Sequence, residues 1–337
     1  MRAAMNGMGR IGRAAFKILI ESGDLEVVAV NDLADPEALA YMIQYDTVYG
    51  RYEKKVSSGS GSISVDGHDI KVLSVKEPEN LPWSDMDIDV VFECTGKFTT
   101  SEDLKKHLSA GAKKVVLSAP AKSEDIGTFI HGVTQPGVEE DIISCASCTT
   151  NAVAPAMEIM GRRIGIKKAS LNTVHAYTSS QNIVDGPHKN LRRGRAGALN
   201  FVPTSTGAAK ATAKALPEYK GRFDGVAIRG PVAAGSVADI VFISERPTTR
   251  EEVNGIFAEE SSTERYREVM GVTESAFVSS DVIMDPRASI MDAGMTQVID
   301  GDLVRIMCWY DNEWGYAAQM IREAVSVLGA EKPVHAG

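Results

Sequence analysis

Residues 6–13 read NGMGRIGR, and this glycine-rich stretch is the strongest indication of fold in the first half of the chain. Its glycines, Gly7, Gly9 and Gly12, follow a short apolar segment at 1–5 and open a helical pattern with one apolar face. A strand, a G-x-G-x-x-G turn and a helix, in that order, begin a dinucleotide-binding βαβ unit. The glycines allow a tight turn and let a pyrophosphate approach the N-terminus of the helix.

An acidic residue completes the pattern at the end of the second predicted strand. That strand covers residues 26–30 (EVVAV), and Asp32 follows it. A carboxylate there can bind the ribose hydroxyls of adenosine and repels a 2′-phosphate, which favours NAD over NADP. The alternative interpretation is an ordinary glycine turn that binds no ligand.

Strands and helices continue to alternate up to residue 147. Strands are predicted at 70–75, 87–94 and 113–118, and a capped helix starts near residue 100. Thr95 and Ser118 end two of these strands, at the edge of a parallel sheet where dinucleotides bind. We therefore expect a doubly wound, Rossmann-type α/β domain.

Two residues of this region are expected to have structural roles only. His107 lies between Leu104 and Leu108 in the predicted helix and is expected on the surface. Trp83 follows a proline and is expected to be a packing anchor.

The stretch SCASCTTN at 144–151 supplies a candidate nucleophile. An apolar run ends before it and a helical pattern follows it, so Cys148 is expected at a strand-to-helix corner. Backbone N–H groups and the helix dipole favour a thiolate there. Ser147 and Thr149 flank the cysteine with hydroxyl groups. The alternative is a buried structural cysteine in a turn rich in serine and threonine.

A predicted strand at 168–177 carries His175. An imidazole near Cys148 would lower the pKa of the thiol by ion pairing and could shuttle a proton. The alternative is a core histidine without a catalytic role. The remaining strands and helices of this half predict a broad, mainly antiparallel sheet with helices on one face.

An irregular segment at 178–203 contains Arg192, Arg193 and Arg195. Clustered arginines suit bidentate capture of phosphate, although nucleic-acid contact or a solvated run of charges would also fit. Residues 204–210 (TSTGAAK) are expected to start a helix whose free N–H groups form a second anion site.

Composition bounds the class of protein. The chain has 337 residues and a formal net charge of -9, which suggests two ordinary domains and argues against nonspecific binding to nucleic acid. No apolar run approaches the roughly 20 residues of a membrane span. Four cysteines do not make a disulfide framework in a chain of this length, so a reducing, cytoplasmic setting is expected.

The motifs NGMGRIGR, SAPAK, SCASCTTN, HAYTSSQ, PTSTGAAK and YDNEWGY follow one another along the whole chain. In this order the sequence resembles the phosphorylating glyceraldehyde-3-phosphate dehydrogenases. The resemblance implies an NAD-binding domain at 1–147, joined by a C-terminal helix at 314–337, and a catalytic domain at 148–313. It also implies a homotetramer. The implied reaction converts glyceraldehyde 3-phosphate and inorganic phosphate to 1,3-bisphosphoglycerate through a thioester on cysteine.

Site roles follow from the resemblance residue by residue, and none of them needs a metal. The catalytic pair is Cys148 and His175. Contacts to the phosphate of the substrate fall on Thr178 and Arg229. Contacts to the attacking phosphate fall on Ser147, Thr149, Thr206 and Gly207, with Arg193 near both phosphates and Arg195 as its rival. Cofactor contacts fall on Gly7, Gly9, Arg10, Ile11, Asp32, Lys76, Thr95, Ser118 and Asn312.

Two departures from the family pattern leave alternatives open. The run GPVAAGSVAD after Arg229 is unusual and leaves the placement of Arg229 and the assembly uncertain. It keeps an erythrose-4-phosphate dehydrogenase, or a non-catalytic NAD-responsive regulator on the same fold, as rivals. Cys145 is the second departure, and we hypothesise that it resolves an oxidised Cys148 into a disulfide. A zinc site at this cysteine pair lacks further ligands nearby in the sequence.

Overall fold

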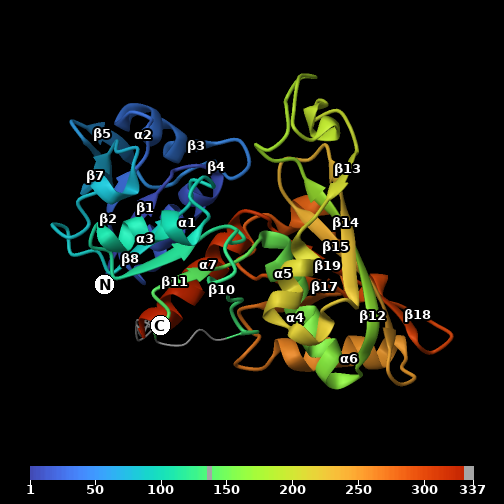
Figure 1. Ribbon diagram of the computed structural model, residues 1–337. Coiled ribbons are helices and arrows are strands. Elements are labelled where there is room, and N and C mark those ends of the chain that lie inside the picture. The colour runs from blue at the N-terminus through green and yellow to red at the C-terminus, as the bar shows by residue number, and fades with distance from the viewer. Residues whose placement is uncertain (135–138, 330–337) are drawn as a thin grey trace. The chain divides into compact units, whose positions relative to one another are not determined.

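The computed structural model describes residues 1–134 and 139–329 (Figure 1). These residues form two compact units. The first holds residues 1–129, 139–146 and 320–329, and the second holds residues 130–134 and 147–319. The parts of the predicted first domain at 135–138 and 330–337 lie outside the described residues.

A nine-stranded sheet forms the centre of the first unit. Its strands are β1 (Arg2–Asn6), β2 (Glu26–Asn31), β5 (Val56–Gly59), β6 (Ser62–Val65), β7 (His68–Leu73), β8 (Val90–Glu93), β9 (Lys114–Leu117), β10 (Gly127–Thr128) and β11 (Ile142–Ser144). Their order is β10-β11-β9-β8-β1-β2-β7-β6-β5. Pairing is parallel from β10 to β7 and antiparallel from β7 to β5. The predicted Rossmann-type sheet is confirmed.

The strand order changes direction at β1, which places a dinucleotide site. The chain runs from β1 to β2 on one side and later returns to β8 on the other side of β1. In doubly wound sheets, ligands bind at the carboxyl ends of the strands at such a switch point. The loops after β1 and β8 therefore form the candidate cofactor edge.

The helices of this unit are α1 (Arg10–Ser22), α2 (Pro36–Gln44) and α3 (Ser101–Ser109), with a 3-10 turn η1 (Pro78–Asn80). A small two-stranded sheet, β3 (Tyr45–Asp46) and β4 (Gly50–Arg51), follows α2. His107 of α3 is 0% exposed, so its expected surface position is wrong. Trp83 is also fully buried in an apolar cluster, which confirms its role as a packing residue, but its indole N–H donates to His107.

An eight-stranded mixed sheet forms the second unit. Its strands are β12 (Ile166–Ala176), β13 (Val202–Ser205), β14 (Phe223–Gly230), β15 (Ser236–Ser244), β16 (Met270–Thr273), β17 (Ser289–Asp292), β18 (Gln297–Ile299) and β19 (Leu303–Tyr310). The order is β13-β14-β12-β15-β19-β17-β16, and β18 pairs with β19. Among the described strands of this second sheet, only β12–β14 and β16–β17 pair in parallel, which confirms a mainly antiparallel sheet.

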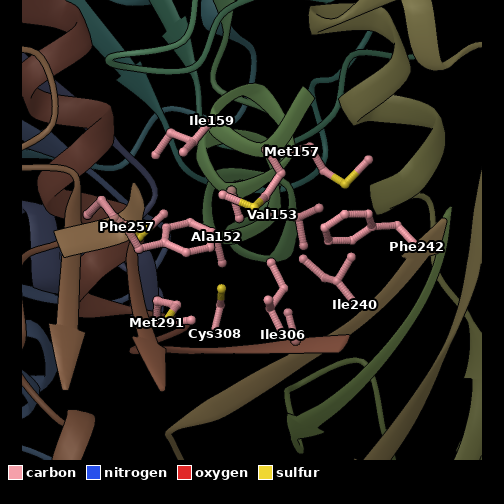
Figure 2. Packing of buried hydrophobic residues seen from close by; sticks show 14 of the residues in the cluster. Ala152, Val153, Met157, Ile159, Ile240, Phe242, Phe257, Met291, Ile306 and Cys308 are labelled. Atoms are coloured by element: carbon pink, nitrogen blue, oxygen red, sulfur yellow. The ribbon is translucent and has the colours of Figure 1, made fainter. Parts of the chain in front are cut away.

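Helix α4 (Cys148–Arg163) packs on this sheet. Alternate residues of β15 and β19 are buried, and these face the apolar side of the helix. Figure 2 shows Val153 and Met157 of α4 against Ile240, Phe242 and Ile306 of the two strands. Burying side chains of this size stabilises a fold by about 1.5–3 kcal/mol each, so α4 is firmly packed against the sheet just after its first turn.

The other helices are α5 (Ala208–Ala215), α6 (Arg250–Ser261) and α7 (Trp314–Leu328), with 3-10 turns η2 (Leu191–Gly194), η3 (Pro217–Tyr219), η4 (Ser279–Val282) and η5 (Ala293–Met295). Helix α7 begins in the second unit and ends in the first. Within 1–134 and 139–329, none of the helices has the length and apolar character needed to cross a membrane.

Candidate active site

Cys148 is the first residue of α4. Ser147 precedes it in an extended conformation and caps the helix, because its hydroxyl accepts a hydrogen bond from the backbone N–H of Thr150 at 3.2 Å. The thiol is half-buried and lies in the first turn, where unpaired N–H groups favour negative charge. The predicted strand-to-helix position of the cysteine is what the chain adopts.

His175, next to the end of β12, faces this thiol. Its Nε2 lies 3.3 Å from Sγ of Cys148, and its Nδ1 lies 2.7 Å from the carbonyl oxygen of Ala176. A carbonyl only accepts, so Nδ1 carries the proton and a neutral imidazole presents a bare Nε2 to the sulfur. The ring is also in edge contact with Tyr310, with centroids 6.0 Å apart.

Burial and one arginine set the charges of this pair. Burial raises the pKa of the Cys148 thiol, and the Arg229 guanidinium works in the opposite direction. Burial and Arg229, with a smaller effect of Arg193, lower the pKa of His175 to about 3. These shifts favour a thiol beside a neutral imidazole, whereas the sequence suggested an ion pair. The positive charge that lowers the pKa of Cys148 comes from Arg229 instead.

Arg229 lies on β14 directly opposite His175 in the parallel register with β12. Its Nη1 donates to the hydroxyl of Thr178 at 3.0 Å and to the carbonyl of Ala176 at 3.2 Å. Its buried Nε has no hydrogen-bond partner among the described residues. The structure therefore joins Arg229 to Thr178, and a buried N–H without a partner is suited to an anionic ligand.

The unusual run after Arg229 does not displace this strand. Gly230 ends β14, and Gly235 turns the chain into β15 with φ of 82°. A Cβ at Gly235 would lie 1.9 Å from the carbonyl oxygen of Ser279, so only glycine fits. Ser236 then accepts a hydrogen bond from Ala176 N at 3.1 Å and donates to Oδ1 of Asn312 at 3.0 Å.

The two rival arginines of the loop have different partners. Arg193 donates to Oγ1 of Thr204 at 3.0 Å and to the carbonyl of Ser205 at 3.4 Å, both neutral acceptors. Arg195 is paired with the carboxylate of Asp185 at 2.6 Å and is well exposed. This favours Arg193 as the phosphate-binding arginine, since its charge is not neutralised by a carboxylate in the described part of the chain.

The residues predicted to contact the attacking phosphate differ in their hydrogen bonds and in the elements to which they belong. Thr149 is buried, and its hydroxyl is 2.9 Å from the hydroxyl of Tyr310, so phosphate must compete with Tyr310 for it. Thr206 accepts from the N–H of Ala208 at 3.1 Å. Gly207 precedes α5, which starts at Ala208, whereas residues 204–205 belong to β13 and do not start the helix as expected.

The first unit brings several predicted cofactor residues together. Gly7 has φ of 95°, and a Cβ there would lie 2.7 Å from Thr95 N, so the loops after β1 and β8 touch. A Cβ at Gly12 would lie 2.0 Å from the carbonyl oxygen of Gly7. The carboxylate of Asp32 accepts from Met8 N at 2.8 Å. Gly7 and Gly12 must therefore be glycine for the turn to pack against the loop after β8 and the start of α1, and a tight turn of this kind is typical of NAD-binding sites.

Other predicted cofactor residues are placed as follows. Gly9 and Ile11 lie at the start of α1, and the guanidinium of Arg10 donates to Asp46 at 2.5 Å. Lys76 is exposed just beyond β7, and Ser118 follows β9. Asn312 belongs to the second unit and is buried.

Tyr310 and Ser236 are site residues that the sequence-based reasoning missed. Tyr310 hydrogen-bonds to both Thr149 and Thr173, and so links the nucleophile helix to β12. Its place at the end of a strand, immediately before Asp311 and Asn312, was the available signal. No comparable signal marked Ser236.

Of the remaining cysteines, Cys145 and Cys308 are buried and Cys94 is half-buried. Burial raises the pKa of Cys94 and of Cys308 to about 12, and raises that of Cys145 well above its ordinary value. None of the four cysteines is in a disulfide. With its pKa raised, Cys145 is almost entirely in the protonated thiol form. Because the thiolate is the form that attacks an oxidised sulfur, this weighs against the hypothesis that Cys145 resolves an oxidised Cys148. Within the described ranges, no cluster of three His, Cys, Asp or Glu side chains could hold a metal ion.

Comparison with known proteins matches both halves of the chain. Residues 1–101 match the family model for the NAD-binding domain of glyceraldehyde 3-phosphate dehydrogenase, and residues 147–312 match the model for its C-terminal domain. A glyceraldehyde-3-phosphate dehydrogenase of Streptomyces coelicolor is 47% identical over 97% of this chain and 98% of its own length. The proteins of that name from Borreliella burgdorferi and Geobacillus stearothermophilus are each 44% identical over 95% of this chain, and over 98% and 96% of their own lengths. With an NAD-binding domain model, a C-terminal domain model and relatives that span almost its whole length, the chain belongs to the glyceraldehyde-3-phosphate dehydrogenase family.

Proposed function

We propose that this chain oxidises glyceraldehyde 3-phosphate with NAD and inorganic phosphate, and forms 1,3-bisphosphoglycerate through a thioester on Cys148. The observation that carries the proposal is the 3.3 Å approach of His175 Nε2 to the Cys148 sulfur, beside an arginine with an unpartnered buried N–H. A protein that only binds NAD has no need of this pair. The first unit is proposed to hold NAD and the second to carry the catalytic residues.

The first step is addition of the thiol to the aldehyde. As the bond between sulfur and the aldehyde carbon forms, Nε2 takes the proton of the thiol and passes it to the aldehyde oxygen. Backbone N–H groups at the start of α4 stabilise the developing negative charge on that oxygen. The product is a thiohemiacetal on Cys148.

Oxidation and phosphorolysis follow on the same carbon. His175 takes the hydroxyl proton of the thiohemiacetal while a hydride leaves, and a thioester remains. When bound, NAD supplies the acceptor for this hydride. A phosphate oxygen then attacks the thioester carbon, the sulfur leaves, and His175 returns its proton to the sulfur.

Bound phosphate also adjusts the strength of the base. Arg229 and Arg193 both lower the pKa of His175, so an anion held by them offsets that effect and raises the pKa. A stronger base is then present only when phosphate groups occupy the site. Arg229 and Thr178 are proposed to hold the phosphate of the substrate, and Arg193 to lie near both phosphates. Ser147, Thr149, Thr206 and Gly207 are proposed to hold the attacking phosphate.

We propose a homotetramer as the working form. The loop at 178–203 exposes five large apolar side chains: Ile183, Val184, Leu191, Leu199 and Phe201. Several large apolar side chains exposed on one loop are suited to burial against a partner subunit. A reactive thiol that must stay reduced also favours the cytoplasm as its location.

The test is formation of NADH from glyceraldehyde 3-phosphate and NAD, with and without phosphate. We expect turnover that requires phosphate and that disappears in Cys148→Ser. Erythrose 4-phosphate is the matched alternative substrate, and faster turnover of it without phosphate would favour the erythrose-4-phosphate dehydrogenase. Absence of turnover with both aldehydes would contradict the proposal and favour an NAD-responsive binding protein.

A further inference from the structure

A chain of hydrogen bonds runs through the interior of the first unit, at the carboxyl ends of β1, β2 and β8. Its side chains are Asn6, Asn31, Glu93, His107 and Trp83, and all five are buried. Glu93 and His107 are 0% exposed. Buried polar groups of this kind are costly unless each is satisfied, so the direction of every bond is informative.

The backbone of Val75 fixes one end of the network. Val75 N donates to Oδ1 of Asn31 at 2.9 Å, and the carbonyl of Val75 accepts from Asn31 Nδ2 at 2.9 Å. The same Nδ2 donates to Oδ1 of Asn6 at 2.7 Å. Asn6 therefore presents its Nδ2 to Glu93 Oε2, at 2.5 Å.

Trp83 fixes the other end. Its indole nitrogen can only donate, and it lies 3.0 Å from Nδ1 of His107. Nδ1 is therefore an acceptor, and the proton of the neutral ring is on Nε2, which donates to Glu93 Oε2 at 3.2 Å. Asn6 Nδ2 and His107 Nε2, 3.4 Å apart, are two donors that converge on one oxygen.

The second oxygen of Glu93 is also surrounded by donors. Oε1 accepts from Thr95 N at 2.8 Å and from the hydroxyl of Thr95. Four donors thus point at two oxygens, and the two ends of the network leave no freedom to reverse them. Only a carboxylate satisfies all four, because a glutamine at 93 would turn an NH2 group toward two donors or toward Thr95.

The members of the network adjoin the cofactor residues one by one. Three of them directly precede a predicted cofactor residue in the sequence: Asn6 before Gly7, Asn31 before Asp32 and Val75 before Lys76. Thr95 is hydrogen-bonded to the carboxylate of Glu93. The loop of Gly7 lies so close to Thr95 that an added Cβ would be 2.7 Å from its N–H, so small displacements matter there.

We propose that Glu93, oriented by His107, is the positioning residue of the NAD site, because its carboxylate holds the loops after β1, β2 and β8 in register for the dinucleotide. The inference rests on the proposed location of that site. Loss of the carboxylate removes the hydrogen bonds that hold these loops together, including those to Thr95, without substituting any of the residues expected to contact NAD. The effect therefore falls on NAD affinity and leaves the Cys148–His175 chemistry intact.

The test measures NAD binding to the full-length protein by titration calorimetry. Glu93→Gln is expected to bind NAD about tenfold more weakly, equal to about 1.4 kcal/mol. The KM for NAD should rise with it, while kcat, the KM for the aldehyde and the alkylation rate of Cys148 stay unchanged. Glu102→Gln, an exposed glutamate of α3, is the matched control and should bind as the wild type does.

A second pair of variants separates positioning from general loss of structure. In His107→Gln the amide can accept from Trp83 and donate to Glu93, whereas His107→Leu can do neither. We expect the glutamine variant to keep NAD affinity within about twofold, and the leucine variant to lose about tenfold. This pair decides the question if Glu93→Gln does not fold.

Two results would overturn this inference without affecting the proposed cofactor site. One is wild-type NAD affinity in folded Glu93→Gln, and the other is an equal loss of NAD affinity in the two His107 variants. Failure of the wild-type protein to bind NAD would overturn the cofactor site itself.

Discussion

At the scale of single residues, Arg229 controls how readily Cys148 ionises. Removing its charge in Arg229→Gln should raise the pKa of the Cys148 thiol further, because the largest effect that opposes burial would be lost and only the hydrogen bonds from Thr149 and the Cys148 backbone would still lower it. Thiolate forms as pH rises toward that pKa, so the pH profile of alkylation by uncharged iodoacetamide should shift to higher pH. The rate at neutral pH should fall several-fold, toward tenfold.

Arg195→Gln is the control for this prediction, because that arginine is paired with Asp185. Its alkylation profile should match that of the wild type. Arg229 also lowers the pKa of His175, but burial is the larger cause and persists in the variant, so His175 stays neutral near pH 7. A shift of the Arg229→Gln profile to lower pH would mean that an imidazolium stabilises the thiolate, and would contradict the role assigned to Arg229.

At the scale of elements, replacing one glycine of α4 with alanine should destabilise the protein, the opposite of the usual effect of this change inside a helix. Alanine in place of glycine inside a helix normally stabilises by up to about 1 kcal/mol. At Gly161, however, an added Cβ would lie 2.0 Å from the buried hydroxyl of Tyr219, which donates to the carbonyl of Met157 at 2.9 Å. Gly161→Ala should therefore lower the free energy of unfolding by about 1–2 kcal/mol, measured by urea denaturation.

The double variant with Tyr219→Phe supplies the control. Without the hydroxyl the added methyl group is accommodated, so in that background Gly161→Ala should be neutral or stabilising. Equal destabilisation in both backgrounds would show that the Tyr219 hydroxyl is not the cause.

The sequence predicts elements better than it predicts polar contacts across them. The glycine pattern and apolar alternation were enough to predict β1, α1, β2 and the mainly antiparallel second sheet, because these signals are local. The burial of His107 was missed, since its partners Trp83 and Glu93 come from distant parts of the chain. A histidine flanked by leucines has no local mark of such partners, and the same is true of Ser236 beside Asn312.

The residues of the candidate active site could be predicted from the sequence, but their charges and some of their contacts could not. Motif resemblance predicted Cys148, His175 and Arg229, and the structure brings these three together on α4, β12 and β14. Their charges were not predictable, because the pKa shifts depend on burial and on the distance to Arg229, which a sequence does not contain. For the same reason the hydrogen bond between Thr149 and Tyr310 was unforeseen.

At the scale of the whole molecule, the exposed apolar loop predicts self-association. Leu191 and Phe201 are 85% and 75% exposed, and burial of each in a subunit interface would contribute about 1.5–3 kcal/mol. We expect the wild-type protein to elute, by size-exclusion chromatography with light scattering, at four times the mass of one chain. Leu191→Asp and Phe201→Asp should shift this mass toward smaller species, because a desolvated carboxylate costs more than the lost apolar contact. Ile299→Asp, at an exposed apolar residue of β18, should leave the mass unchanged, and a wild-type monomer would contradict the assembly.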